Sequence, residues 1–193
     1  MFVPFACSVV AFVSSSTSTT RVKMTQCSAS AAAALQSLPS LLDSKGGELT
    51  LSATKSKLHG KRVALFFSAG WCPMCTSFEP ALLQFREAAT ASSKDVEIIY
   101  VPSDRSETDL LKRTEAMDML SVRIGEEADA LKKRFCVWAG SECVKLGSGR
   151  RSGVPALVVL DGKCGEELAF LPAESQGAKS LQSWPLENAD GIW

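Results

Sequence analysis

The sequence is poor in histidine and tyrosine, has no excess of either charge and contains no long apolar run. One histidine and one tyrosine occur among 193 residues, and 21 basic residues balance 21 acidic ones, so the formal net charge is zero. Nucleic-acid-binding domains are usually basic on at least one face, so we expect no nucleic-acid partner. No apolar stretch reaches the roughly 18 residues that indicate a membrane span, so we also expect no membrane-spanning segment.

The shortage of histidine also bears on metal binding. A structural zinc site uses two close cysteine pairs, or one such pair with two spaced histidines. The chain offers a single CxxC pair and His59 alone. We therefore expect no metal site. No glycine-rich nucleotide fingerprint follows a predicted strand, so we expect no bound cofactor either.

Cysteine is more frequent, but its pattern does not indicate a disulfide framework. The number is odd and the spacing irregular, unlike the paired cysteines of small secreted scaffolds. The seven residues are Cys7, Cys27, Cys72, Cys75, Cys136, Cys143 and Cys164. Hydrophobic residues make up 46% and charged residues 22% of the chain, which together with its length predicts one well-buried domain with a tail.

Acidic residues are absent before Asp43. Residues 2–13 form a short, mainly apolar stretch, and a run rich in Ser and Thr follows it at 14–20. This order resembles the apolar region of a signal peptide or part of an organellar transit sequence, although a basic start is missing. The alternatives are a disordered extension, or translation that begins at Met24.

These shifts in composition divide the chain into three parts. We expect an extension or targeting segment at 1–31, a folded domain at 32–187 and a short tail at 188–193. A location in the cytoplasm follows if the extension is not a signal, and an organellar (plastid-like) or secretory one follows if it is. No function is assigned to Cys7 or Cys27.

Periodicity predicts an α/β domain with a central mixed sheet flanked by helices. Continuous apolar runs predict buried strands, and apolar residues at helical spacing predict amphipathic helices. The expected strands are 63–67, 96–101 and 156–160, with 167–171 as an antiparallel partner after a turn at Asp161 and Gly162, and a short strand at 48–51. The expected helices are 73–92 (kinked at Pro80), 106–117, 126–135, a short one at 35–42 and a final one around Leu181 and Trp184. Loops are expected before Gly60 and over 137–153.

The stretch Trp71-Cys72-Pro73-Met74-Cys75 carries the chemistry. It follows a predicted buried strand and opens a predicted helix, and open α/β sheets place their sites at the carboxyl ends of such strands. The unpaired N–H groups at a helix N-terminus stabilise a thiolate, and a proline is tolerated in the first turn. The spacing i, i+3 brings the two sulfurs within reach of one another.

This arrangement predicts thiol–disulfide exchange. Cys72, expected to be the more exposed cysteine, attacks a substrate disulfide, and Cys75 then attacks Cys72 to release the reduced substrate. The alternative is a chance pair of small buried cysteines. Trp71 is interpreted as a flat apolar wall beside the sulfurs, with an ordinary packed aromatic as the alternative.

Residues 67–75, followed by Phe78 and Pro80, resemble the tryparedoxin and nucleoredoxin branch of the thioredoxin superfamily. The resemblance extends upstream through 58–61 and downstream through 153–156. It implies the thioredoxin fold, with a cis proline at Pro155 that faces the CxxC sequence and a Val154 backbone offered to the substrate. The alternative is a trans proline that opens a strand. We expect Trp71, Pro73, Val154 and Pro155 to contact the substrate.

The sequence departs from that branch at several positions. Phe66 stands where thioredoxins carry a buried aspartate, so water or another nearby group must move the proton. Met74 replaces the proline most often found in tryparedoxins, which affects redox potential and partner choice. The region 136–153 looks longer than its counterpart in the family.

This longer region carries further candidates. Cys136 and Cys143 could form a regulatory disulfide, with two free thiols as the alternative. Arg150 and Arg151 could guide an acidic partner, with a solvated loop end as the alternative. Cys164 and His59 are interpreted as incidental, and His59 as exposed.

The resemblance implies a protein-disulfide reductase. It would pass electrons from an external dithiol or reductase to oxidised protein substrates, which include peroxidases as candidates. One alternative is a redox-gated adaptor of the nucleoredoxin type. Another is a secretory oxidase or isomerase, which depends on the first forty residues being a cleaved signal.

Overall fold

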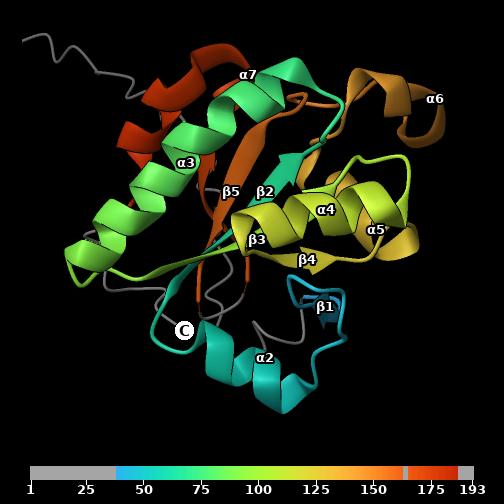
Figure 1. Ribbon diagram of the computed structural model, residues 1–193. Helices are drawn as coiled ribbons and strands as arrows, with labels where there is room; N and C mark the ends of the chain where they lie inside the picture. The colour runs from blue at the N-terminus through green and yellow to red at the C-terminus, as the bar shows by residue number, and fades with distance from the viewer. Residues whose placement is uncertain (1–37, 163–164, 187–193) are drawn as a thin grey trace, which may run out of the picture.

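A six-stranded mixed sheet forms the centre of the molecule, in the order β1-β4-β3-β2-β5-β6 (Figure 1). The computed structural model describes residues 38–162 and 165–186. The strands are β1 (Leu41–Leu42), β2 (Arg62–Ser68), β3 (Val96–Pro102), β4 (Leu120–Val122), β5 (Ala156–Leu160) and β6 (Glu167–Leu171). β2, β3 and β4 run parallel, whereas β1, β5 and β6 are antiparallel to their neighbours. This is the expected mixed sheet.

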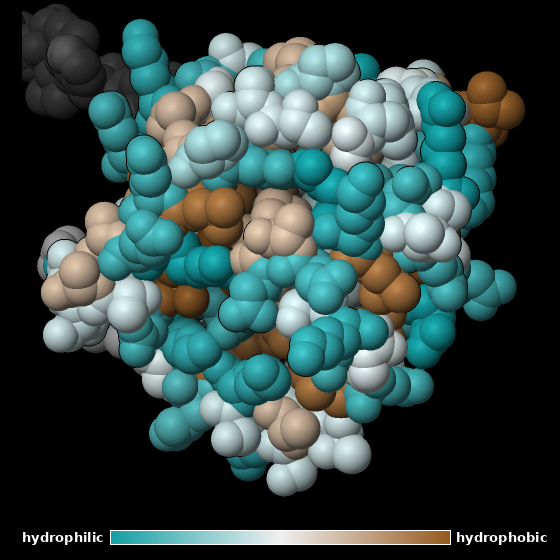
Figure 2. Space-filling view, in the orientation of Figure 1, coloured by the Kyte–Doolittle hydropathy of each residue, from teal (hydrophilic) through white to brown (hydrophobic). Residues whose placement is uncertain are grey.

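Helices cover both faces of the sheet and give two apolar cores. The helical elements are α2 (Leu51–Leu58), α3 (Pro73–Ala91), α4 (Glu107–Met117), α5 (Glu126–Phe135), η1 (Gly140–Glu142), α6 (Cys143–Leu146), α7 (Ala173–Gln176) and η2 (Gly177–Ser183). Side chains of α2 and α5 pack on one face and those of α3, α4 and η2 on the other. Burial of apolar groups in these cores leaves a mainly hydrophilic outer surface on the face in Figure 2, with small separate apolar patches.

Burial on both faces explains why the central strands read as continuous apolar runs. Every residue of β2 and β5 is buried, and alternate residues of β2 enter opposite cores, with Leu65 in one and Phe66 in the other. A sheet with two covered faces removes the polar alternation that a one-sided sheet shows. The predicted strands at 63–67, 96–101, 156–160 and 167–171 are confirmed within one or two residues.

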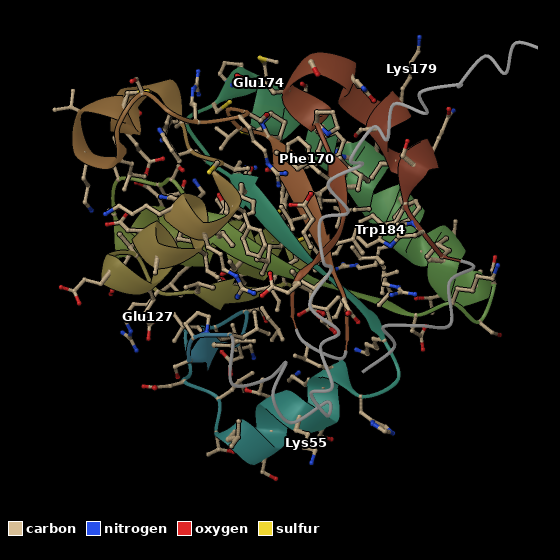
Figure 3. All side chains as sticks on the ribbon, turned by 180° about the vertical axis from the view of Figure 1, so that it is seen from behind. Lys55, Glu127, Phe170, Glu174, Lys179 and Trp184 are labelled. Carbon is tan, nitrogen blue, oxygen red and sulfur yellow. The ribbon has the colours of Figure 1, made fainter. Side chains whose placement is uncertain are left out.

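The helix after the CxxC sequence is also confirmed. α3 begins at Pro73 and ends at Ala91, and it buries Phe78 and Leu82 against the sheet. Its far end is covered by the C-terminal segment, where the ring of Trp184 lies 4.8 Å from that of Phe85. Figure 3 shows Trp184 on the side of the molecule where η2 lies along α3.

Several expectations for the first part of the domain are wrong. Leu41 and Leu42 form the strand β1, which pairs with β4, and not part of a helix. The leucines are buried at the edge of the sheet, and their spacing only resembles that of a helix. The strand expected at 48–51 is reduced to a single bridge between Leu42 and Glu48.

The loop expected before Gly60 is largely the helix α2, capped by the Thr50 hydroxyl. Only Thr54 and Leu58 of this helix are buried, too few to leave a helical pattern in the sequence. The helix expected at 35–42 lies partly outside the described residues.

The middle and the end of the domain also differ in part. β4 has only three residues, too few for a periodic pattern, and it was not expected. The loop expected at 137–153 contains η1 and α6, and its two ends are joined by a bridge between Val137 and Ser152. The short helix expected near the C-terminus is present as α7 and η2.

Among residues 38–162 and 165–186, no helix is both long and apolar enough to cross a bilayer.

Candidate functional site

The two sulfurs of the CxxC sequence occupy the first turn of α3, directly beyond the carboxyl end of β2. Cys72 is the N-cap residue of α3, and its sulfur accepts a hydrogen bond from the Cys75 backbone N–H at 3.4 Å. Cys72 keeps 8% of its surface exposed, whereas Cys75 is completely buried. Both are free thiols. A partner can therefore reach only the first sulfur directly.

Chain folding places Val154 and Pro155 beside Cys72. The Val154–Pro155 peptide bond is cis, which confirms the expectation for Pro155. The Cys72 thiol faces the Val154 carbonyl oxygen, with 3.7 Å between sulfur and oxygen. The CxxC sequence and the segment before β5 thus form one site, although 82 positions separate them in the sequence.

Trp71 is held in place at the rim of this site. Its indole N–H donates to the Ser103 carbonyl oxygen at 2.8 Å, and the Arg105 guanidinium lies 5.4 Å from the ring centroid. The side chain stays 39% exposed, and Met74 is 48% exposed. These two side chains give the surface around Cys72 an apolar character, and the exposed Pro73 lies between them in the sequence.

The segment that was expected to be a free loop supports the position of Trp71. Glu142 accepts hydrogen bonds from the Ser103 hydroxyl at 2.7 Å and from the Ala139 backbone at 2.9 Å. Its other carboxylate oxygen pairs with the buried Lys132 at 2.5 Å. Because Ser103 also holds the indole of Trp71, the Glu142 carboxylate acts on the site through one intermediate residue.

A second carboxylate holds the chain just before the cis proline. Glu174 accepts a hydrogen bond from the Gly153 backbone N–H at 2.5 Å and one from the Ser152 hydroxyl at 3.3 Å. A Cβ added at Gly153 would meet the ends of the Glu174 and Arg150 side chains, which would have to shift. Figure 3 shows Glu174 close to α3, near the end of the molecule where the CxxC helix begins.

Cys75 loses its proton with difficulty. Burial raises the pKa of its thiol to about 12, and the hydrogen bond to Cys72 acts in the same direction. The Ser68 hydroxyl and the Ala69 backbone oppose this shift only in part. At neutral pH Cys75 is thus a protonated thiol that needs a base before it can attack.

A buried tyrosine–aspartate pair lies near this thiol. Phe66 is fully buried between Phe78 and Tyr100, so no carboxylate occupies that position. The Tyr100 hydroxyl instead donates to Asp104 at 2.6 Å, and the Gly70 backbone N–H donates to the other Asp104 oxygen at 2.7 Å. Burial raises the pKa of Asp104.

Sequence reasoning missed Tyr100 and Asp104. The available signal was weak: the single tyrosine of the chain stands in a buried strand, four positions before an aspartate.

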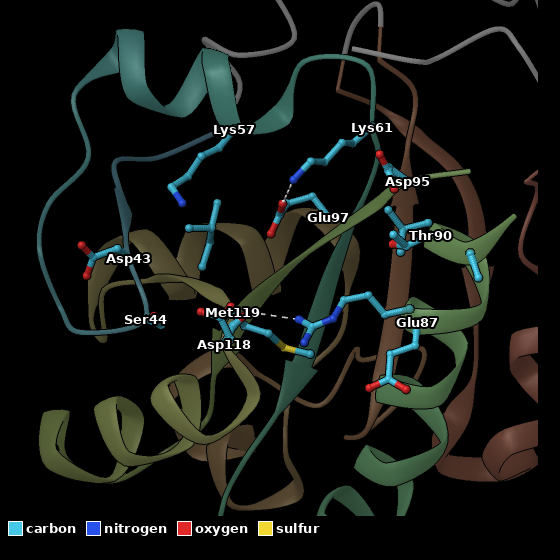
Figure 4. A pocket seen from close by; sticks show the side chains of 14 residues that line it. Asp43, Ser44, Lys57, Lys61, Glu87, Thr90, Asp95, Glu97, Asp118 and Met119 are labelled. Atoms are coloured by element: carbon cyan, nitrogen blue, oxygen red, sulfur yellow. Dashed lines mark hydrogen bonds and ion pairs between the residues drawn. The ribbon is translucent and has the colours of Figure 1, made fainter. Parts of the chain in front are cut away.

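Two cavities differ in their relation to the sulfurs. A cavity of about 340 Å³ lies beside Trp71 and is also lined by Gly70 and Asp104. A larger one, of about 700 Å³, lies at the opposite end of the sheet, where β3 begins (Figure 4). Among its charged side chains, Lys61 pairs with Glu97 at 2.6 Å and Arg86 donates to the carbonyl oxygens of Met117 and Asp118. The smaller cavity is the one that borders the CxxC sequence, through Gly70 and Trp71.

The remaining cysteine candidates are not drawn together into the site. Cys136 ends α5 and Cys143 begins α6, and both are free thiols, so the regulatory disulfide between them is not formed in this structure. Cys7, Cys27 and Cys164 lie outside the described residues. Within the part that is described, no three His, Cys, Asp or Glu side chains cluster as metal ligands.

Arg150 is half-buried and Arg151 is exposed, and each makes contacts within the fold. Arg150 donates to the Trp138 carbonyl oxygen at 2.8 Å. Arg151 pairs with Glu167 at 2.5 Å and lies 3.9 Å from the ring centroid of Phe170. These contacts engage both cations within the fold. His59 is exposed at the end of α2, as expected.

Comparison of the sequence with known proteins points to one family. A family model described as thioredoxin-like matches residues 60–167, more than half of the chain. The probable nucleoredoxin 3 of Oryza sativa subsp. japonica is 35% identical over 103 residues, which are 53% of this chain and 20% of that protein. Tryparedoxin of Trypanosoma brucei brucei is 41% identical over 66 residues, which are 34% of this chain and 42% of that protein. The matched part spans about a fifth of the nucleoredoxin.

Solved structures agree with this result. Tryparedoxin from Trypanosoma brucei has a TM-score of 0.55 and 26% identity, and the match covers 77% of this chain and 92% of that chain. A tryparedoxin II complexed with glutathionylspermidine has a TM-score of 0.58 and covers 85% of this chain and 99% of that chain, with 23% identity. The second likeness shows the fold alone.

The sheet order, the cis proline and the similarities lead to the same assignment. The fold is the thioredoxin fold, and membership of this group supports a thiol–disulfide redox function. The chain belongs to the thioredoxin-like family, in the branch of the nucleoredoxins and tryparedoxins.

Proposed function

We propose that the chain is a protein-disulfide reductase with Cys72 as nucleophile and Cys75 as resolving thiol. The observation that carries this proposal is the unequal exposure of the two sulfurs. Cys72 reaches the surface at a helix N-terminus, beside the Val154 carbonyl, while Cys75 is completely buried behind it. Thiol–disulfide exchange needs one accessible thiolate and a second thiol that is protected until a mixed disulfide forms.

The reaction consists of two exchanges. The Cys72 thiolate attacks one sulfur of a substrate disulfide, so that a mixed disulfide forms and the other substrate sulfur leaves as a thiolate. The Cys75 thiolate then attacks the Cys72 sulfur, which forms the Cys72–Cys75 disulfide and releases the second substrate thiolate. An external dithiol or reductase must return the two electrons before the next cycle.

The surface around Cys72 fits a protein substrate better than a small one. Leu51, Trp71, Met74 and Val144 are the large apolar side chains exposed in the described part of the chain. Two of these four flank Cys72. We assign substrate contacts to Trp71 and Pro73 on one side and to the Val154 backbone and Pro155 on the other.

Catalysed reduction of insulin by dithiothreitol tests the proposal. The wild-type chain should accelerate the reaction, and Cys72→Ser should reduce the rate to background because the attacking sulfur is lost. Cys143→Ser is a matched control, since it removes a half-buried thiol outside the site. Catalysis by Cys72→Ser at the wild-type rate would contradict the assignment of the nucleophile.

The insulin assay and the redox potential together distinguish the reductase from its two alternatives. A wild-type chain that gives no rate above background would instead favour a redox-gated adaptor. A measured potential of about −120 mV would favour a secretory oxidase over a reductase, for which we expect a value of about −270 mV.

A further inference from the structure

The cavity of about 340 Å³ adjoins the CxxC sequence, and the two exchange reactions described above make no use of it. Gly70 and Trp71, the two residues before Cys72, form one wall, and residues after β3 and on α4 form the rest. The Trp71 indole is fixed by its hydrogen bond to the Ser103 carbonyl oxygen, so this wall keeps its position. A substrate held at Cys72 therefore lies next to the cavity.

The carboxylates that line the cavity already accept hydrogen bonds from this chain. Asp104 is buried and accepts from the Gly70 backbone N–H at 2.7 Å and from the Tyr100 hydroxyl at 2.6 Å. Asp109 accepts from the Ser106 hydroxyl at 2.7 Å, at the start of α4. Both carboxylates thus have donors within the fold before any ligand arrives.

Two of the three cations that line the cavity have no carboxylate partner. The Arg113 guanidinium pairs with Glu79 of α3. Lys112 and Arg105 are exposed, and over residues 38–162 and 165–186 neither forms an ion pair. Arg105 lies over the face of Trp71, 5.4 Å from the ring centroid. An ammonium carries three N–H donors and a guanidinium five, so the cavity presents unused donors with positive charge.

We propose that this cavity binds an acidic side chain of the protein substrate, close in sequence to the substrate's disulfide-bonded cysteine. A carboxylate accepts charge-assisted hydrogen bonds from both lysine and arginine, and arginine can bind it through two parallel bonds. In an extended segment, a residue three positions from the cysteine lies up to roughly 10 Å away from it. A carboxylate a few positions from that cysteine can therefore enter a cavity walled by Trp71.

This inference rests on the proposed function and names a class of substrate for it. The class consists of proteins with Asp or Glu beside an accessible disulfide. Lys112 and Arg105 are specificity-determining residues in this reaction, since they contact the substrate and not the reacting sulfurs.

The preference has its origin in the cavity and not in the charge of the whole molecule. The formal net charge of the chain is zero, so long-range attraction favours neither acidic nor basic substrates. At about 0.1 M salt, charges that are more than roughly 10 Å apart are largely screened. Groups close to the bound segment then decide between acidic and basic substrates.

Three peptides that differ only in charge test the inference. Each has a single cysteine, joined by a disulfide to thionitrobenzoate, and the residues on both sides of that cysteine are Glu, Gln or Lys. The Cys72 thiolate attacks the peptide sulfur, a bond forms between these two sulfurs, and thionitrobenzoate leaves as a coloured thiolate. Colour therefore reports the first exchange with the peptide in place. The full-length chain, with every cysteine except Cys72 and Cys75 changed to serine, avoids signals from other thiols.

The rate with the Glu peptide divided by the rate with the Gln peptide is the quantity to compare. In the parent chain at about 0.1 M salt this ratio should be about five, as expected for two ion pairs at a partly exposed site. The Lys peptide should be the slowest of the three. At about 1 M salt the ratio should approach one, because screening then acts over roughly 3 Å.

Lys112→Glu reverses one charge of the cavity and should bring the ratio below one. Both residues are good helix formers, so α4 should remain intact at this exposed position. Lys179→Glu is the matched control, because it changes the net charge equally on the exposed surface of η2, where Lys179 points away from the core (Figure 3). Its ratio should stay within about twofold of the parent value, since the charge is screened from the cavity.

The outcomes separate this inference from the function on which it rests. A parent ratio of one, or an equal ratio for the parent chain and Lys112→Glu, would show that the cavity does not select acidic substrates, and so would an equal fall for Lys179→Glu. Release of thionitrobenzoate by Cys72 would in those cases still support the reductase. If no peptide reacts faster with the parent chain than with Cys72→Ser, both proposals are wrong.

Discussion

The two sulfurs of the CxxC sequence differ in exposure although only two residues separate them. Cys72 borders the surface, and Cys75 is completely buried with a pKa raised to about 12, chiefly by burial. A raised pKa keeps the thiol protonated, and therefore unreactive, at all pH values below it. The difference in reactivity follows from position in the first helical turn and from the side chains that cover the second sulfur.

This difference can be measured by alkylation. We expect iodoacetamide to modify Cys72 first, and to modify Cys75 at a rate that rises about tenfold per pH unit between pH 7 and 10 without a plateau. Peptide mapping by mass spectrometry of the Cys72→Ser variant measures the second rate. Glutathione under the same conditions is the control, because an ordinary thiol reaches a plateau above its pKa of about 8.5 to 9. A plateau for Cys75 in that range would contradict its burial.

The residues of the site were predictable to different degrees. Cys72 and Cys75 were found because a strand-to-helix transition around CxxC has a chemical meaning. Pro155 was found from the family resemblance. Tyr100 and Asp104 carry no motif, and their contact depends on how β3 ends, which local sequence does not specify.

At the scale of elements, the segment between α5 and β5 helps to hold Trp71 in place beside Cys72. Glu142 at the end of η1 connects the buried Lys132 to Ser103, which in turn fixes the Trp71 indole. The segment that the sequence predicts to be a loop thus supports Trp71 at the rim of the site. This role could not be predicted from the sequence, because the segment is rich in Gly and Ser and its contacts are to distant residues.

Glu142→Ala tests this connection. The change leaves Lys132 unpaired, so we expect the free energy of unfolding to fall by about 3 kcal/mol. The loosened Trp71 should raise the KM for insulin by about tenfold, which corresponds to about 1.4 kcal/mol of lost binding. The reaction of Cys72 with a small aromatic disulfide should hardly change. Glu115→Ala, at an exposed position of α4, is the control; an equal KM for both variants would contradict the connection.

Elements with long apolar signals were predictable, and short ones were not. Burial on both faces marks β2 and β5 clearly, and α3 shows its buried face in the spacing of Phe78 and Leu82. β4 has three residues and α2 buries only two side chains, so neither leaves a periodic signal. β1 was mistaken for a helix because Leu41 and Leu42 owe their burial to β4, a partner that is distant in sequence.

At the scale of the whole molecule, the C-terminal segment completes one of the two cores. Trp184 and Leu181 are buried against α3 and the sheet, and the Trp184 ring lies 4.8 Å from that of Phe85. The end of the described chain therefore stabilises the helix that carries the CxxC sequence at its other end.

Trp184→Ala should lower the free energy of unfolding by about 3–5 kcal/mol, the usual cost of removing a large buried aromatic side chain. Urea unfolding with an unchanged m value measures this effect. Lys179→Ala in the same segment is the control, since this side chain points away from the core (Figure 3). A change below about 1 kcal/mol for Trp184→Ala would show that the segment is dispensable.

The contact of Arg151 with Glu167 and Phe170 has a consequence for self-association. β6 pairs only with β5 in the described chain, so one of its sides offers backbone groups that another polypeptide could use to extend the sheet. Such recruitment would strip water from a carboxylate and a guanidinium that are fixed beside this strand, which is unfavourable. The ion pair between Arg151 and Glu167 therefore disfavours the pairing of a second polypeptide with β6.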